Sequence, residues 1–257
     1  MKRTLIVVLG ALGAQAAFAG VYVEMVDREN GTEEIAQKIY VQNGLGRFVD
    51  AEGRATLIKN NTMYIIDDQD KSYVAFDKAT MEQLAKKISV QMEKAREQLA
   101  KLPPEQRAQM EQMMPGLSGG ERKHTVEALD TGKSDKVDGR ACRVWDIKRN
   151  GELDDQVCVV PYSSLPGKEN FQVVFANFAK AFEEMAKAVP MLAGMMSNEF
   201  DAQSKVNGFA VRTVGYEEGR LGTAQQVMRV WREEAIASSM FEIPAGYKQK
   251  QMSTGGE

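Results

Sequence analysis

The sequence predicts an α+β fold in which a curved antiparallel β-sheet, open like half of a barrel, carries two helical insertions packed on its concave face. Residues 20–76 alternate short runs rich in Val, Ile, Tyr and Thr with polar turns, a pattern typical of an antiparallel meander. Two later segments, near 80–114 and 168–200, place apolar residues every three or four positions and so indicate amphipathic helices. Strand-like segments lie between and after these two insertions.

The first 19 residues have the order of a secretory signal peptide. Lys2 and Arg3 precede an apolar run, and the small-residue site Ala-Phe-Ala ends at Ala19. The apolar run is shorter than the roughly 18 residues of a membrane helix, and no later stretch reaches that length. We therefore expect cleavage after Ala19, a soluble protein in the periplasm without a stable membrane anchor, and a single domain over residues 20–257.

The charge of the chain disfavours some partners. The net charge is −3 at pH 7, and removal of the two leader cations makes the mature chain more acidic. Polyanions such as nucleic acid attract basic surfaces, so neither nucleic acid nor an anionic lipid surface is an expected partner.

Six short strands are expected in the first part of the chain. They span residues 21–28, 34–42, 47–51, 55–59, 62–67 and 71–76. Successive side chains of a strand point to opposite faces of the sheet. In the first strand Val21, Val23 and Met25 share one face, and Tyr22 and Glu24 lie on the other. One face of the sheet is therefore apolar and needs a cover.

The first insertion supplies one such cover. Thr80 and Gln83 have the spacing of a capping box, and a helix of about 22 residues is expected from there to Pro103-Pro104. Its apolar positions are Met81, Leu84, Ile88, Met92, Ala95, Leu99 and Leu102. A second, short helix is expected over residues 105–114.

The two cysteines, Cys142 and Cys158, are expected to form a disulfide because the chain is exported. They flank a predicted hairpin. A three-residue loop at 149–151 would place them directly opposite each other, whereas a two-residue Asn150-Gly151 loop would put the thiols on opposite faces. We therefore predict an odd loop or a bulge. A redox-active pair is the alternative, but the spacing is not Cys-x-x-Cys.

The second insertion carries an aromatic stripe. Phenylalanines recur at helical spacing, at Phe171, Phe175, Phe178 and Phe182. Val174, Met185 and Val189 extend the same face. Core packing against the sheet accounts for most of these residues, although the aromatic stripe is unusually large. The closing part of the chain is expected to form strands near 208–216 and 223–233, followed by the segment 240–248.

No catalytic constellation is convincing, so an enzyme is not expected. Gly116 to Gly120 matches the pattern G-x-S-x-G around Ser118, but a helix and Pro115 precede the serine where a strand is required. The one histidine, His124, follows four residues after the motif instead of late in the chain. Adjacent acid pairs point to opposite faces of a strand and are interpreted as surface charges.

No metal or other cofactor is expected. The methionines gather in or beside the helical insertions, at Met110, Met113, Met114, Met185, Met191, Met195 and Met196. Thioethers favour Cu(I), but neither a second histidine nor a free cysteine is available to complete a typical copper site. Flexible methionine side chains more often fill irregular cores or line surfaces that accept varied apolar partners.

Three segments carry a family resemblance. They read Asp-Asp-Gln-Asp-Lys-Ser-Tyr at 67–73, Gly-Arg-Ala-Cys-Arg-Val-Trp at 139–145 and Phe-Glu-Ile-Pro-Ala-Gly-Tyr-Lys at 241–248. Together they resemble a family of bacterial exported proteins classed as domain of unknown function 4412. More distantly, the plan of the chain is similar to the periplasmic lipoprotein-carrier (Lol-type) fold. That similarity implies a curved sheet around helices with an apolar cavity for acyl chains, which the phenylalanines of the second insertion could fill.

The expected function is a periplasmic binding or carrier protein for an apolar group, a lipid or an acyl chain. The ligand would lie between the sheet and the helices, against Val21, Val23, Met25, Leu84, Ile88, Met92, Phe171, Phe175 and Phe178. The alternative is an envelope protein-interaction or stress-related protein with no small ligand, whose methionine-rich segments dock another envelope protein.

Overall fold

The computed structural model describes residues 19–103, 106–107, 125–188 and 205–251, with side chains described up to Lys180 in the second of the two long helices. The described strands form one sheet in the order β12-β6-β5-β4-β3-β2-β1-β11-β10-β9-β8-β7. Every neighbouring pair is antiparallel except β12 and β6, which are parallel. The predicted α+β fold with an open antiparallel sheet is confirmed.

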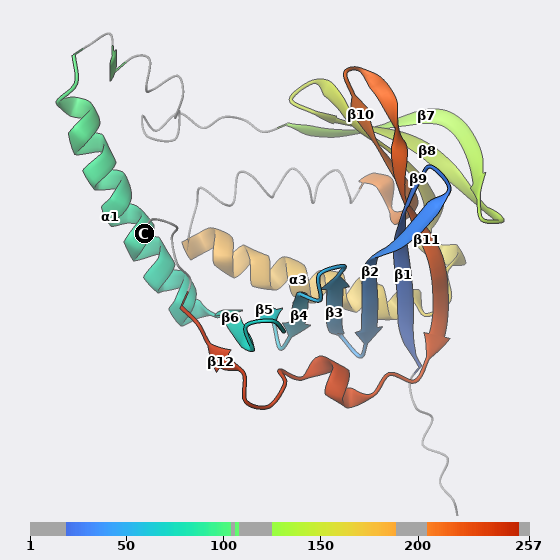
Figure 1. Cartoon of the computed structure of the whole chain (residues 1–257), viewed down its shortest axis with the longest axis horizontal. Coiled ribbons are helices and arrows are strands. Elements are labelled where there is room, and N and C mark those ends of the chain that lie inside the picture. The colour runs from blue at the N-terminus through green and yellow to red at the C-terminus, as the bar shows by residue number, and fades with distance from the viewer. Residues whose placement is uncertain (1–18, 104–105, 108–124, 189–204, 252–257) are drawn as a thin grey trace, which may run out of the picture.

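Two meanders meet at the centre of this sheet. The first consists of β1 (Gly20–Glu29), β2 (Thr32–Gln42), β3 (Leu45–Asp50), β4 (Ala55–Lys59), β5 (Thr62–Asp67) and β6 (Ser72–Phe76). The second consists of β7 (Val126–Val137), β8 (Arg140–Arg149), β9 (Glu152–Pro161), β10 (Gly208–Glu217) and β11 (Arg220–Glu234). Because β1 pairs with β11, the first strand of the domain joins the two meanders. Figure 1 shows the resulting curvature, with β7–β9 standing above the row of β1–β6.

The meander turns follow from their residue types. Asn43-Gly44 and Asn150-Gly151 both have positive φ at each position, the conformation of two-residue hairpin turns that Asn and Gly adopt readily. Such turns fix the register of the flanking strands, as in the pairing of Tyr40 with Arg47. The strand bounds of the first meander therefore lie close to those expected from the sequence.

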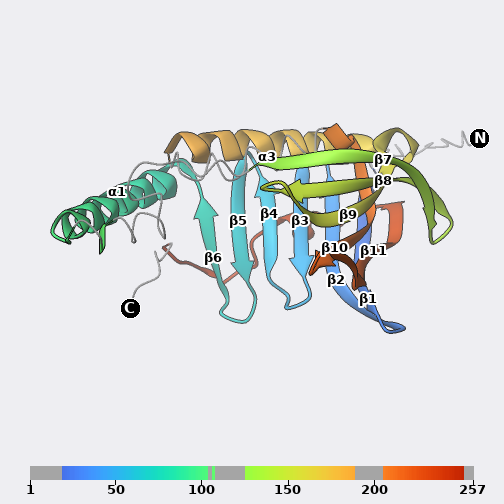
Figure 2. The same cartoon turned by 90° about the horizontal axis from the view of Figure 1, so that it is seen from above.

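The two long helices have different relations to the sheet. Helix α3 (Lys168–Ala188) lies along one face of the first meander, over β2, β4 and β5. Helix α1 (Lys78–Ala100) starts at the end of β6, contacts α3, and then runs out beyond the edge of the sheet (Figures 1 and 2). The helical cover that the sequence predicted is thus supplied mainly by α3, while α1 packs beside it.

The N-cap of helix α1 lies three residues earlier than expected. Asp77 is the N-cap, and its carboxylate accepts a hydrogen bond of 2.8 Å from the Thr80 backbone N–H. The predicted cap at Thr80 is therefore wrong. The Asp77 side chain precedes the first turn and can accept from its free N–H groups, whereas Thr80 already lies inside that turn.

A buried cluster lies on each face of the sheet. The larger cluster joins the two meanders and α3, and includes Val21, Val23, Met25, Phe171, Val174 and Trp231. The smaller one lies on the opposite face, where the segment after β11 crosses beneath β3–β5 through a short 3-10 helix, η2 (Ser238–Phe241), before reaching β12 (Lys248–Gln249). Its centre is formed by Ala55, Leu57, Ile66, Ile236 and Phe241.

Candidate binding site

The first turns of α3 are fixed to the sheet by two asparagines. The Asn170 side chain accepts a hydrogen bond from the Asn43 N–H at 3.0 Å and donates one to the Ala19 carbonyl at 3.1 Å. The Asn177 amide donates to the Gly44 carbonyl at 2.9 Å. These bonds hold the helix across the turn between β2 and β3, with its apolar side against the sheet.

The helix approaches the sheet closely because β3 has no side chain at Gly46. A Cβ placed at Gly46 would lie 2.7 Å from Val174 Cγ1 and 3.1 Å from the Phe48 ring. Contacts under about 3 Å require a neighbour to move, and both neighbours belong to the packed interface. Glycine at this position thus sets the distance between α3 and the sheet.

Phe171 is enclosed by aromatic rings from the second meander. Its ring stacks on that of Trp231 and meets that of Phe209 edge-on. The Trp231 indole N–H donates to the Pro166 carbonyl at 2.9 Å, which satisfies the polar end of the ring. This part of the interface is filled by side chains.

Six of the nine predicted ligand-binding residues come together here. Val21, Val23, Met25 and Phe171 are buried in one cluster, and Phe175 and Phe178 lie partly exposed at its margin. The face that the sequence assigned to the first strand is correct, but the strand is irregular. Its register with β11 shifts after Glu24 and its register with β2 shifts after Met25, so that Val26 is buried as well.

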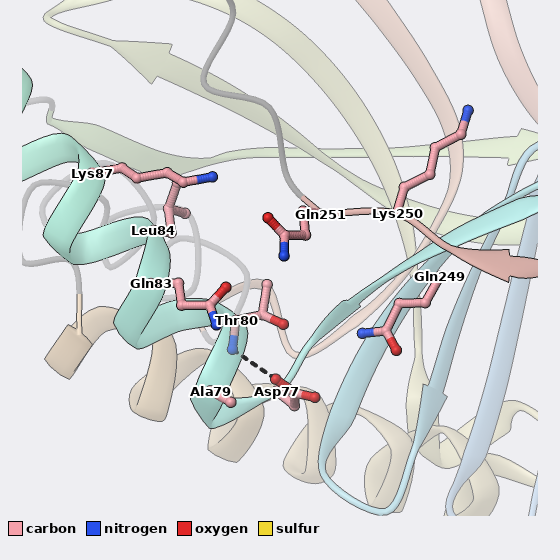
Figure 3. Close-up of a pocket in the computed structure, with 9 residues that line it drawn as sticks. All are labelled: Asp77, Ala79, Thr80, Gln83, Leu84, Lys87, Gln249, Lys250 and Gln251. Carbon is pink, nitrogen blue, oxygen red and sulfur yellow. Dashed lines mark hydrogen bonds between the residues drawn. The ribbon is translucent and has the colours of Figure 1, made fainter.

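The three predicted residues of α1 lie apart from this cluster. Leu84 is buried near the start of α1, and Ile88 and Met92 are partly exposed on the next two turns. Figure 3 shows Leu84 beside polar residues of a pocket between α1 and residues 249–251, lined also by Gln83 and Lys87. The nine residues therefore fall into two groups, six in or beside the large buried cluster and three on α1.

The disulfide between Cys142 and Cys158 is present, with a Cα–Cα distance of 5.4 Å. The loop of its hairpin is the two-residue Asn150-Gly151 turn, so of the two predicted alternatives, an odd loop or a bulge, the odd loop is not the one found. The predicted bulge is confirmed, because the register shifts between Ile147 and Lys148. After this shift Cys158 faces Val144, and the bond joins two diagonal positions on the same face instead of a directly opposed pair.

The face of β1 turned away from α3 carries a buried carboxylate. Glu24 accepts hydrogen bonds from the Tyr22 hydroxyl at 2.7 Å and from Arg229 Nε at 2.7 Å. Burial alone would raise the pKa of Glu24, but these two hydrogen bonds, with the positive charges of Arg229 and Lys38, hold it below the usual value. Burial and the Glu24 carboxylate raise the pKa of Tyr22. The network is an ion pair with all its groups partnered, typical of a structural role.

The face of the sheet turned away from α3 also carries a groove that the sequence analysis did not predict. It lies between strands β2 and β3 and the segment 239–245, and it is lined by Lys38, Tyr40, Arg47, Val49, Met240 and Ile243, among others. Arg47 is buried there, beside Tyr40 in the sheet register. The signal that could have located it is the Asn43-Gly44 turn, which fixes that register and puts Arg47 and Tyr40 on one face.

Several predicted features lie outside the described residues. These are the leader before Ala19, Ser118 and His124, and the side chains of the methionine cluster. Within the described ranges, no group of three or more His, Cys, Asp or Glu could hold a metal ion. Among the helices of those ranges, none is long and apolar enough to cross a membrane. A docking surface built on the methionines stays a prediction.

Comparison with known proteins gives a family and a distant structural likeness. The family described as Domain of unknown function (DUF4412) matches residues 86–247. No curated protein matches the chain. A crystal structure of an uncharacterized conserved protein from Thermus thermophilus is similar over 91% of this chain and 90% of that one, with 8% identity and a TM-score of 0.42. The family match covers more than half of the chain, which therefore belongs to the DUF4412 family.

Proposed function

We propose that this protein acts in the bacterial periplasm, after export, as a binding or carrier protein for an apolar group such as a lipid or an acyl chain. The observation that carries the proposal is the change in burial along α3. Phe171 and Val174 are about 1% exposed, whereas Phe175 and Phe178 keep part of their surface exposed. A stripe that served only core packing would be expected to be covered along its length.

In this proposal the ligand lies at the end of the stripe that points towards α1. Phe175 and Phe178 supply aromatic surface, and Ile88 and Met92 supply apolar surface from α1, which packs against α3. Val21, Val23, Met25 and Phe171 form the closed floor behind this surface. Leu84 is buried near the start of α1.

The energetics suit an acyl chain. Each CH2 group removed from water contributes about 0.8 kcal/mol, so several buried methylenes give useful affinity after the costs of association. Partly exposed aromatic side chains offer large contact area with few rotatable bonds. No charged group of the ligand is required for binding at this surface.

The experiment combines native mass spectrometry with dye displacement. Protein purified from the periplasm should carry an apolar species, and its N-terminal sequence should begin at Gly20. Lipids should displace the apolar dye 1-N-phenylnaphthylamine from the protein. A clean apo mass together with no displacement by lipids would reject the proposal.

Variants locate the ligand. Phe178→Gln and Ile88→Gln should each weaken dye binding about tenfold, the equivalent of about 1.4 kcal/mol. Leu129→Gln, an exposed apolar position on β7, is the matched control and should bind as the unmodified protein does. Equal binding by all three variants would show that the dye sits elsewhere.

A further inference from the structure

The groove between β2, β3 and the segment 239–245 is a second site, on the face of the sheet opposite α3. It is open to solvent along one side and has a volume of about 720 Å³, within the range of about 300–1,000 Å³ typical of small-molecule sites. Its floor is the sheet face that carries Lys38, Tyr40, Arg47 and Val49, and its rim is the chain from Ser239 to Ala245. All of these residues lie in the described part of the chain.

Arg47 is the unusual residue of this groove. It is 8% exposed, and its guanidinium group carries a permanent positive charge. Nη1 donates to the carbonyl oxygens of Met240 and Glu242, each at a long 3.4 Å. Nε is buried without a hydrogen-bond partner. A buried donor that has lost its hydrogen bond to water destabilises the fold, so the protein does not fully satisfy the hydrogen-bonding capacity of Arg47.

The acids around the groove are already engaged. The Glu242 carboxylate pairs with Lys59 at 2.5 Å, and the Glu24 carboxylate is held by Tyr22 and Arg229. Among the described residues, no carboxylate forms a salt bridge with Arg47. Lys38 adds a second cation to the same wall. Lys38 lies opposite Glu24 in the register of β1 and β2, so the cation of the groove without a carboxylate partner among the described residues is Arg47.

Tyr40 adds a neutral donor next to Arg47. Burial and nearby carboxylates raise the pKa of Tyr40, so its hydroxyl keeps its proton at neutral pH. Its ring packs on that of Tyr22, with centroids 5.1 Å apart, which fixes its position in the sheet. Tyr40 and Arg47 are direct neighbours across β2 and β3.

The remaining walls are apolar. Val49 lies on the floor, and Met240, Ile243 and Pro244 lie on the rim. Phe241, between two rim residues, is buried in the smaller core cluster and anchors this segment to the sheet. A ligand that uses the whole groove needs an anionic end and an apolar end.

We propose that this groove binds an organic carboxylate with an alkyl tail of medium length. The carboxylate lies against the guanidinium group of Arg47, whose planar set of donors suits the two oxygens of a carboxylate, with Lys38 and the Tyr40 hydroxyl beside it. The alkyl tail runs along Met240 and Ile243. This site is on the other face of the sheet from Phe175 and Phe178, so it does not depend on the function proposed for α3.

Calorimetric titration of the full exported protein with three probes tests the chemistry. Decanoate should bind at least tenfold more tightly than decanol, which has the same tail without the charge. Decanoate should also bind at least tenfold more tightly than inorganic phosphate, which has charge without a tail. Equal affinity for decanol would overturn the role of Arg47, and equal affinity for phosphate would overturn the role of the apolar rim.

Variants place decanoate in the groove. Lys38→Gln and Arg47→Gln should each lower its affinity about tenfold, and Ile243→Gln should lower it several-fold. Arg47→Lys keeps the charge without the planar set of donors, and should bind more weakly than the unmodified protein while remaining folded. Arg54→Gln, at an exposed turn outside the groove, is the matched control. Unchanged affinity in folded Lys38→Gln and Arg47→Lys would overturn the proposal.

A further variant separates the two sites. Phe178→Gln should leave decanoate affinity unchanged, because that side chain lies on the α3 face. A loss of decanoate binding in Phe178→Gln, with no loss in Ile243→Gln, would assign decanoate to the α3 face and reject the groove.

Discussion

The Phe171 ring stacks on the Trp231 ring with centroids 4.7 Å apart and an interplanar angle of 24°. Phe209 meets both rings edge-on, at 5.8 Å from Phe171 and 5.0 Å from Trp231. The three side chains come from α3, β11 and β10, so one aromatic cluster joins the helix to two strands of the second meander. Aromatic pairs in these arrangements add about 0.5–1.5 kcal/mol each beyond the burial of their surface.

Removing the Phe171 ring should therefore be costly. Phe171→Ala is expected to lower the free energy of unfolding by about 3–5 kcal/mol, because it leaves a cavity beneath the rings of Trp231 and Phe209. Urea denaturation followed by tryptophan fluorescence measures the change. Val173→Ala, on the exposed side of the same helix, should change stability by less than about 0.5 kcal/mol. Equal effects of the two substitutions would contradict the packing described for Phe171.

The spacing of α3 from the sheet depends on Gly46. Gly46→Ala should destabilise the protein by about 1–3 kcal/mol, since the new methyl group meets Val174 at 2.7 Å. Gly215→Ala provides the comparison, because its new Cβ would have no neighbour closer than 3.9 Å and its backbone conformation suits alanine. Thermal melting should fall for the first variant and stay constant or rise for the second. An unchanged melting temperature for Gly46→Ala would show that the packing between α3 and β3 adjusts to the added methyl group at little cost.

The disulfide should contribute substantially to stability. It closes a loop with a sequence separation of 16, for which a contribution of about 2–4 kcal/mol is typical. The Cys142→Ala, Cys158→Ala double variant should unfold at lower urea concentration than the oxidised protein and should not respond to dithiothreitol. The unmodified protein should fall to a similar stability when reduced. If reduction leaves its unfolding curve in place, the bond contributes little.

The Glu24 network predicts a pH dependence. Its pKa in the folded state lies below the ordinary value of 4.5, so the unfolded chain binds a proton first as the pH falls. The stabilisation by Glu24 is thus complete above about pH 4.5 and is lost as the pH drops through the folded-state pKa. Glu24→Gln should cost about 1–3 kcal/mol at pH 7 and much less near pH 3.

The comparison for this prediction is Glu127→Gln, which changes an exposed acid on β7. Urea denaturation of the three proteins at several pH values gives the free energy of unfolding for each. A difference between the unmodified protein and Glu24→Gln that stays constant from pH 7 to pH 3 would show that the carboxylate charge does not matter.

Local sequence signals predicted the helices and strands well, because turn geometry and side-chain alternation act over only a few residues. The polar turn Asn43-Gly44 fixes a hairpin, and the alternation of Val21, Val23 and Met25 marks a buried face. The N-cap of α1 was misplaced because the spacing of Thr80 and Gln83 matches a capping box, although Asp77 caps the helix three residues earlier. The Cys142 and Cys158 pairing was predicted, and the register of the two cysteines called for an odd loop or a bulge, but only the structure places that bulge between Ile147 and Lys148 and makes the pairing diagonal.

The candidate sites were less predictable than the fold. Periodicity identified apolar positions on both helices, yet it could not distinguish the enclosed Phe171 from the partly exposed Phe175, four residues later. Arg47 was not selected at all. A charged residue in a strand is expected at the surface, and it becomes buried here because the segment from Ser239 to Ala245, almost two hundred residues later, covers it.

The sequence by itself determined the strands, the two long helical segments, the apolar face of β1 and the partner of each cysteine. These follow from side-chain alternation, helical spacing, turn residues and the number of cysteines. The tertiary structure alone decided that α3 covers the sheet while α1 extends past β6, and that the C-terminal segment closes the second face over Arg47. These arrangements depend on contacts between residues far apart in the chain. The hydrophobic effect has no direction, so many arrangements bury a similar apolar area, and only the assembled sheet distinguishes among them.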